Sequence, residues 1–190
     1  MKTTRRTCLK MMATATGGLA SGVIGTQLVT HLPNRPIKPF KALTPAEAAV
    51  IEACAEQIIP ADQDPGARDA GVIFYIDKQL SRKFKKNLPT YQRAVISLDQ
   101  MCQSLHKKNF IDLDFATQTQ IMQALESNKV PANIWKDVSA RDFFNLVREH
   151  TMQGFYGSPR HGGNKDYASY RMLGLDYPRL MGQNRYKEVL

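Results

Sequence analysis

The sequence predicts an all-α protein: a small, irregular bundle of about five to six helices that includes a long C-terminal loop rich in glycine and aromatic residues. Three observations favour this fold class. Apolar residues recur at intervals of three and four along several segments, which is the period of a helix with one buried face. Helix-capping signals precede several of these segments. No segment alternates apolar and polar residues for long enough to predict a strand.

The first two predicted helices lie in the first half of the chain. Thr44 can cap the first helix, Pro45 suits its first turn, and Glu47 can complete a capping box. Pro60 ends the apolar pattern of this helix. After a turn-rich stretch, a second helix is predicted over about residues 67–84. Its apolar stripe consists of Ile73, Ile76, Leu80 and Phe84.

Three further helices are predicted downstream. The third begins after Pro89 with Thr90 as its cap, the fourth covers about residues 115–126, and the fifth starts at a capping box of Ser139 and Asp142. The apolar positions are Tyr91, Ala94, Val95, Leu98, Cys102 and Leu105 in the third, Ile121, Met122 and Leu125 in the fourth, and Phe143, Val147, His150 and Thr151 in the fifth, flanked by Phe144 and Leu146.

Residues 1–30 resemble a twin-arginine export signal. Arg5 and Arg6 precede a weakly apolar, glycine-containing stretch over residues 11–29, an order typical of signals that export folded proteins. The alternative is a retained membrane anchor, although glycines and hydroxyl residues make a poor span. No Ala-x-Ala site ends the stretch, so cleavage stays open. We therefore expect a periplasmic protein, exported by the Tat pathway and either released or held at the inner membrane.

A proline-rich linker over residues 31–42 separates this signal from the body of the chain. The body is one predicted domain over residues 43–180, because 190 residues leave little room for a second. Residues 181–190 are a predicted tail.

The net charge of +9 belongs mostly to the N-terminal segment. The first 38 residues contain no acidic residue, and the rest of the chain is only mildly basic. The densest basic run of the body, residues 82–86, is short, and such runs are more often solvated faces than binding sites. We therefore expect no nucleic-acid partner. The basic residues of the N-terminal segment are Lys2, Arg5, Arg6, Lys10, Arg35 and Lys38.

The sequence lacks the motifs of common cofactor sites. It has no Cys-x-x-Cys-His for covalent haem, no glycine-rich turn between a strand and a helix for a dinucleotide, and no P-loop. We therefore expect no catalytic residue, cofactor or metal in this chain. His150 lies on an apolar stripe and is expected to be a hydrogen-bonded core residue. Cys54 and Cys102 also fall on apolar faces. They are either buried thiols or, in the periplasm, members of a disulfide with each other or with a partner chain.

The composition changes after the fifth helix. Residues 154–174 contain five of the twelve glycines together with four aromatic residues. Glycine allows close backbone approach, and aromatic and arginine side chains anchor binding surfaces. This loop is therefore either a binding element or a packing loop that closes the core of the domain.

Two separated motifs carry a family resemblance. One is Ile58-Ile59-Pro60-Ala61-Asp62 with Pro65-Gly66-Ala67, Ala70-Gly71-Val72, Ile76-Asp77 and Leu80. The other is Pro159-Arg160-His161-Gly162-Gly163-Asn164-Lys165-Asp166 with Tyr170, Leu173-Gly174 and Tyr177-Pro178. Together with the Thr-Pro-x-Glu helix start at Thr44, they resemble the gluconate 2-dehydrogenase subunit 3 family, the small or gamma subunit, over about residues 43–180. The family commonly has Tyr at the position of His161 and Trp at that of Tyr170.

The resemblance implies an accessory subunit. Family members are partners of a large flavoprotein that carries FAD and oxidises a sugar or sugar acid, and a cytochrome c subunit with haem c often accepts the electrons. The small subunit holds no cofactor, and its signal is thought to carry the folded flavoprotein through the Tat translocase. The resemblance makes Gly162, Gly163 and Asn164 loop-shaping residues. Contacts to the large subunit would come from Phe155, Tyr156, Arg160, His161 and Tyr170.

Two other functions remain open at this point. One is a stand-alone periplasmic binding or scaffold protein, anchored or free, with a small ligand under the glycine loop. The other is a self-sufficient enzyme, which the lack of a clustered acid, base and nucleophile disfavours.

Overall fold

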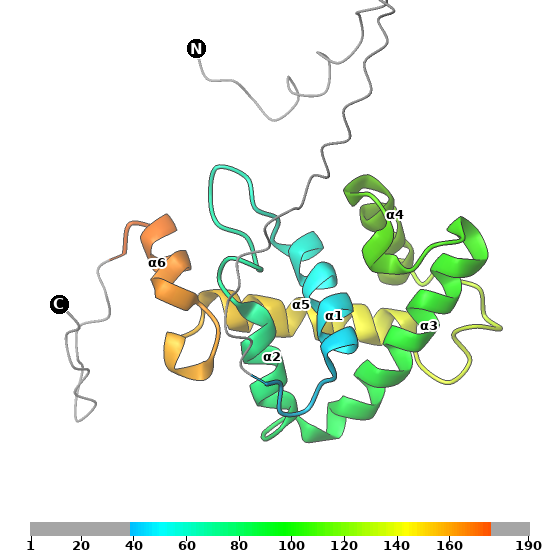
Figure 1. Cartoon of the computed structure of the whole chain (residues 1–190), viewed down its shortest axis with the longest axis horizontal. Helices are drawn as coiled ribbons and strands as arrows, with labels where there is room; N and C mark the ends of the chain where they lie inside the picture. The colour runs from blue at the N-terminus through cyan, green and yellow to red at the C-terminus, as the bar shows by residue number, and fades with distance from the viewer. Residues whose placement is uncertain (1–38, 176–190) are drawn as a thin grey trace, which may run out of the picture. The chain divides into compact units, whose positions relative to one another are not determined.

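The computed structural model describes residues 39–175, which form six α-helices and no strand (Figure 1). This confirms the predicted all-α fold. Arg5, Arg6, most of the linker and the tail lie outside the described residues. No helix between residues 39 and 175 is long and apolar enough to cross a membrane. The helices are α1 (Pro45–Ile58), α2 (Val72–Leu80), α3 (Leu88–His106), α4 (Phe115–Glu126), α5 (Ala140–Tyr156) and α6 (Ala168–Met172).

Helix α1 begins at the predicted capping box. The backbone N–H of Glu47 donates to Thr44 Oγ1 at 3.3 Å, and the backbone N–H of Thr44 donates to Glu47 Oε2 at 2.8 Å. Pro45 occupies the first turn, where its missing N–H would have had no helical partner. The sequence around Thr44 therefore determines the start of α1 without help from distant residues.

The chain enters α1 through a turn that Asp77 holds. Asp77 Oδ1 accepts backbone N–H bonds from Ala42 at 2.8 Å and Leu43 at 3.1 Å, and both carboxylate oxygens accept from the N–H of Lys41. Asp77 is only 5% exposed, so these amides replace water as its partners. Through Asp77, α2 fixes where the linker meets the domain.

Helix α2 is shorter at both ends than the predicted helix over residues 67–84. Gly71 precedes it with φ of +62°, a left-handed conformation that starts a new helical segment and leaves the residues before it in turns. At the other end the chain leaves the helix after Leu80, and the ring of Phe84 stacks on His150 with centroids 4.7 Å apart. Phe84 therefore packs against His150 of α5 and does not extend the apolar stripe of α2.

Helix α3 differs from its prediction in its cap and in one core position. It begins at Leu88, so Thr90 lies inside the first turn and is not the cap. Leu105 is 58% exposed, whereas the other predicted positions of this face are buried. The chain instead places Phe110 in the core at this end, where the backbone N–H of Phe110 donates to Asp99 Oδ1 at 2.9 Å.

Side chains cap the N-termini of α4 and α5. Asp114 accepts from the backbone N–H of Thr117 at 3.0 Å, a cap that the sequence analysis did not predict. Ser139 accepts from the backbone N–H of Asp142 at 3.2 Å, so Ser139 is the predicted cap of α5. The return bond from the Asp142 side chain is not formed, and only half of the predicted capping box is present.

Helix α5 is the centre of the bundle. It packs against each of the other five described helices and runs across behind α1 in Figure 1. Burying one large apolar side chain contributes about 1.5–3 kcal/mol, so this shared core is the main source of stability. Its fully buried side chains on α5 include Phe143, Val147 and Phe155, and they meet Ile51 of α1 and Leu98 of α3 in one cluster.

Candidate functional site

The loop over residues 157–167 follows α5 and lies against α2. Gly162 has φ of +113°, and a Cβ there would lie 3.0 Å from the carbonyl oxygen of Phe74 in α2. A Cβ on Gly163 would overlap the carbonyl oxygen of Gly154 in α5. Only glycine fits at both positions, because the backbone packs directly on its neighbours. This contact leaves no space for a small ligand between Gly163 and Gly154.

Asn164 holds the loop closed from inside. Its side chain is fully buried, with Nδ2 donating to the carbonyl of Gly157 at 2.8 Å and Oδ1 accepting from the N–H of Ser169 at 2.9 Å. The next residue, Lys165, donates its backbone N–H to the carbonyl of Ala70 at 2.9 Å. Asn164 therefore joins the start of the loop to the start of α6, while Lys165 ties the loop to the turn before α2.

The outer side of the loop carries polar and aromatic side chains. Arg160 and His161 are exposed, and Arg160 Nε donates to His161 Nε2 at 3.0 Å. Lys78 of α2 donates from Nζ to the carbonyl of Arg160 at 2.7 Å, which fixes the loop backbone to α2. Tyr170 of α6 is half-buried, with its ring centroid 6.0 Å from that of Tyr167. Three predicted contact residues thus belong to one ordered loop and the helix that follows it.

Partial desolvation and two neighbouring cations lower the pKa of His161. The cations are Arg160 and Lys78. Both disfavour a positive charge on the imidazole, so His161 is neutral at neutral pH and can accept the hydrogen bond from Arg160.

Two of the predicted contact residues lie outside the loop, in the last turn of α5. Phe155 is fully buried, and its ring makes an edge-to-face contact with Tyr156 at 4.9 Å between centroids. Phe155 therefore belongs to the core and offers no surface to a partner in this structure. Tyr156 is 40% exposed and stays available for contact. The position of Phe155, four residues after the buried Thr151, is the sequence signal that places it on the helix stripe.

An exposed aromatic pair next to the loop was not singled out in the sequence. Phe74 of α2 is 40% exposed, and its ring stacks on Phe40 with centroids 5.9 Å apart. A Cβ on Gly71 would contact both the Phe74 ring at 3.3 Å and Lys165 Cβ at 3.7 Å, so the pair borders the loop. Phe74 lies off the predicted apolar stripe of Ile73, Ile76 and Leu80, and this is the sequence signal that could have identified it as exposed.

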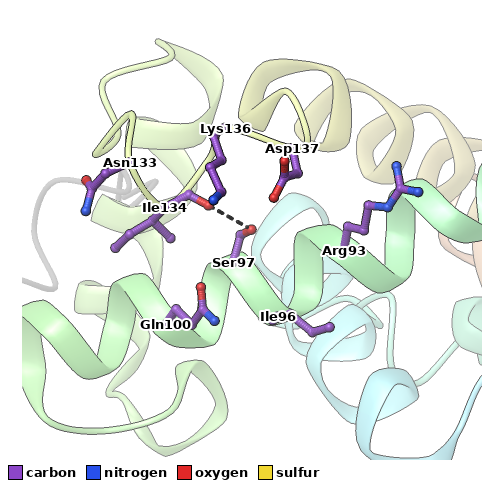
Figure 2. Close-up of a pocket in the computed structure, with 8 residues that line it drawn as sticks. All are labelled: Arg93, Ile96, Ser97, Gln100, Asn133, Ile134, Lys136 and Asp137. Carbon is purple, nitrogen blue, oxygen red and sulfur yellow. Dashed lines mark hydrogen bonds between the residues drawn. The ribbon is translucent and has the colours of Figure 1, made fainter.

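A separate hollow of about 710 Å³ lies between α3 and the segment that precedes α5 (Figure 2). Ser97 Oγ donates to the carbonyl of Ile134 at 3.2 Å, so this hydroxyl is bound to a backbone acceptor. Ile96 is 59% exposed. The hollow therefore offers mainly polar contacts, contributed by α3 and by the segment that precedes α5. Its lining residues are Arg93, Ile96, Ser97, Gln100, Asn133, Ile134, Lys136 and Asp137.

The two cysteines and one histidine that the sequence places on apolar faces lie in the core of the described domain. Between residues 39 and 175, no three His, Cys, Asp or Glu side chains gather in a way that could hold a metal ion. Cys54 and Cys102 are both buried and free. His150 is 1% exposed, with Nδ1 2.9 Å from the hydroxyl of Tyr91, as expected of a hydrogen-bonded core histidine.

Comparison with known proteins identifies the family. The family described as gluconate 2-dehydrogenase subunit 3 matches residues 45–176. That range covers all six described helices and both sequence motifs up to Gly174. No curated protein and no solved structure gave a match. On the strength of the match over residues 45–176, this chain belongs to the gluconate 2-dehydrogenase subunit 3 family.

Proposed function

We propose that this chain is the non-catalytic small subunit and Tat export escort of a periplasmic or membrane-associated FAD-dependent dehydrogenase of the gluconate 2-dehydrogenase type, acting on a sugar or sugar acid. Its family supports the coarser part, membership of a multi-subunit dehydrogenase complex. The observation that supports docking on a larger subunit is the 157–167 loop, whose exposed side is held in one conformation by Asn164 and by Lys78.

A loop fixed in this way suits the docking of a large protein. Ordering a flexible loop at an interface reduces affinity, so a loop that is already locked binds more tightly. Arg160, Tyr156 and Tyr170 are the residue types that most often dominate binding energy at protein interfaces. In this proposal the loop grips the flavoprotein subunit, which supplies the flavin chemistry, and a cytochrome c subunit carries the electrons away.

The complex is tested by affinity purification of the tagged full-length chain from its native host. A stoichiometric protein with a flavin absorbance spectrum supports the proposal, whereas a monodisperse single chain overturns it and supports the stand-alone alternative. Arg160→Ala with His161→Ala should release the flavoprotein. Arg141→Ala serves as the matched control, because Arg141 is an exposed arginine at the start of α5.

Export is tested separately, since the signal lies outside the described residues. Replacing Arg5 and Arg6 by Lys should leave the dehydrogenase activity of the large subunit in the cytoplasm. Arg35→Lys, in the linker, is the control and should leave the periplasmic activity unchanged. Unchanged periplasmic activity in the Arg5→Lys/Arg6→Lys strain would overturn the escort role but not the subunit role.

A further inference from the structure

Charge is distributed unevenly along the folded domain. All charged residues from Lys78 to Leu98 are basic. The charged residues of the preceding segment, 42–77, are acidic except for Arg68. In Figure 1 the loop that follows α1 lies at the top of the domain and the turn between α2 and α3 lies at the bottom. The basic residues are Lys78, Arg82, Lys83, Lys85, Lys86 and Arg93.

Four of these cations form the turn between α2 and α3, called the basic turn below: Arg82, Lys83, Lys85 and Lys86. All four are exposed. The ion pairs among residues 39–175 involve other basic residues, namely Arg68, Arg148 and Lys165. Lys83 Nζ lies 5.5 Å from the centroid of the Phe84 ring. Within the described residues, no ion pair therefore neutralises the charge of this turn.

The basic turn continues onto the 157–167 loop through one face of α2. Phe74 and Lys78 are one helical turn apart, and Arg82 follows Lys78 by four residues. A Cβ on Gly162 of the loop would lie 3.0 Å from the backbone carbonyl oxygen of Phe74, and Lys78 Nζ donates to the carbonyl of Arg160. The stacked pair of Phe40 and Phe74 thus has cationic residues beside it in both α2 and the loop.

Three acidic residues near this face, within the described part of the chain, already have partners. Asp166 Oδ2 lies 3.9 Å from Lys165 Nζ. The carboxylate of Asp77 is buried and occupied by three backbone amides. Glu149 of α5 accepts a hydrogen bond from Gln153 and lies near Tyr75 of α2. The lowered pKa of His161, caused in part by Arg160 and Lys78, agrees with a positive potential here.

We propose that the partner surface that docks on this face is an acidic protein surface with an apolar depression for the Phe74 ring. This inference rests on the proposed function and adds the chemistry of the flavoprotein's docking site. Carboxylates opposite the basic turn would speed association and fix its orientation, while the aromatic centre would slow dissociation. A protein is favoured over a lipid surface because Lys78 holds the loop in a defined shape. Anionic lipid headgroups attract basic residues through charge alone, so binding to them would not require a loop of defined shape.

The experiment measures binding of the flavoprotein released from the co-purified complex to the full-length chain. The dissociation constant should rise by about tenfold or more between about 0.05 and 0.5 M NaCl, because salt screens exposed charges. Lys85→Glu with Lys86→Glu should weaken binding by about tenfold at low salt and reduce the salt dependence. Phe74→Ala should mainly increase the dissociation rate. The matched control is Lys108→Glu with Lys129→Glu, two exposed lysines outside this face.

Each outcome separates this inference from the proposed function. If no flavoprotein co-purifies with the wild-type chain, the proposed function fails. If it co-purifies but neither salt nor the Lys85→Glu/Lys86→Glu change alters its affinity, the acidic docking surface is overturned. The same holds if this change abolishes binding to phosphatidylglycerol vesicles, or self-association seen by sedimentation, while leaving flavoprotein binding intact. Circular dichroism of each variant shows whether its helices are retained.

Discussion

The hydroxyl of Tyr91 lies 2.9 Å from Nδ1 of His150 in the core between α3 and α5. Phe84 also stacks on the imidazole, at 4.7 Å between ring centroids. Burial lowers the pKa of His150 and raises the pKa of Tyr91 well above its ordinary value, while the charge of Glu149 acts on His150 in the opposite, weaker direction. The pair is therefore built from two neutral side chains.

From the pair of His150 and Tyr91 we predict that the domain loses stability in mild acid. The pKa of His150 is lower in the folded state, so below the ordinary histidine pKa of about 6.5 the unfolded chain binds the proton more readily. The stabilisation by neutral His150 is complete above that pH and is lost as the pH falls through it toward the folded-state pKa. The melting temperature, followed by circular dichroism, should fall between about pH 7 and pH 5.

Histidine variants assign the pH effect. His150→Gln should lower the melting temperature at neutral pH and flatten its decline in acid. His106→Gln, at the exposed end of α3, should behave as the wild type. His161→Gln tests the other described histidine with a lowered pKa. A His150→Gln protein with the full wild-type pH dependence would show that the core pair is not the cause.

We predict a large loss of stability when the Asp77 side chain is replaced by that of alanine. Asp77→Ala would leave the backbone N–H groups of Lys41, Ala42 and Leu43 without their acceptor at the entrance to α1. Hydrogen bonds to charged groups contribute about 1.5–3 kcal/mol each, and a total loss of about 2–4 kcal/mol is expected because water replaces part of them. Urea unfolding at neutral pH measures this loss. Asp112→Ala, at an exposed carboxylate, should change the stability by less than about 0.5 kcal/mol.

The features that sequence predicts well here depend on residues close together in the chain. The box of Thr44 and Glu47 and the cap at Ser139 are formed within one helical turn, and both start their helices where expected. His150 could be assigned to the core because its position repeats the spacing of Phe143 and Val147. The family resemblance likewise depends on short contiguous motifs.

The features that sequence does not predict depend on contacts between distant segments. Asp77 reads as a polar residue at the surface of α2, and only the folded chain brings the amides of Lys41 to Leu43 onto it. The predicted second helix starts too early because Gly71 has a left-handed φ of +62°, and the turn before it is also bound by a distant residue, through the bond from Lys165 N–H to the carbonyl of Ala70. Periodicity carries no information about such partners.

The buried cysteines predict slow alkylation in the native state. Burial raises the pKa of the Cys102 thiol to about 12 and raises that of Cys54 as well, helped by the neighbouring Cys102. The thiolate is the reactive form, so neither should react with iodoacetamide at about pH 8, whereas both should react in urea. A chain carrying Cys8→Ser removes the third cysteine from the mass-spectrometric readout. Rapid native labelling of either residue would contradict the buried placement.

Gly163 packs directly against α5, and we therefore predict that adding one methyl group at this position disrupts the 157–167 loop. In Gly163→Ala the new Cβ would overlap the carbonyl oxygen of Gly154. This oxygen belongs to the backbone of α5 and cannot rotate away as a side chain could, so the loop must move to remove the overlap. A cost of about 1–3 kcal/mol is expected, with faster hydrogen exchange at the Ser169 amide that Asn164 holds. Gly174→Ala is the matched control, because Gly174 has φ of +63° and a Cβ there would have no neighbouring atom within 4 Å. Only conformational strain of about 1 kcal/mol is therefore expected, and the Ser169 amide should stay protected. Equal protection of that amide in both variants would mean that the loop is not held by its contact with α5.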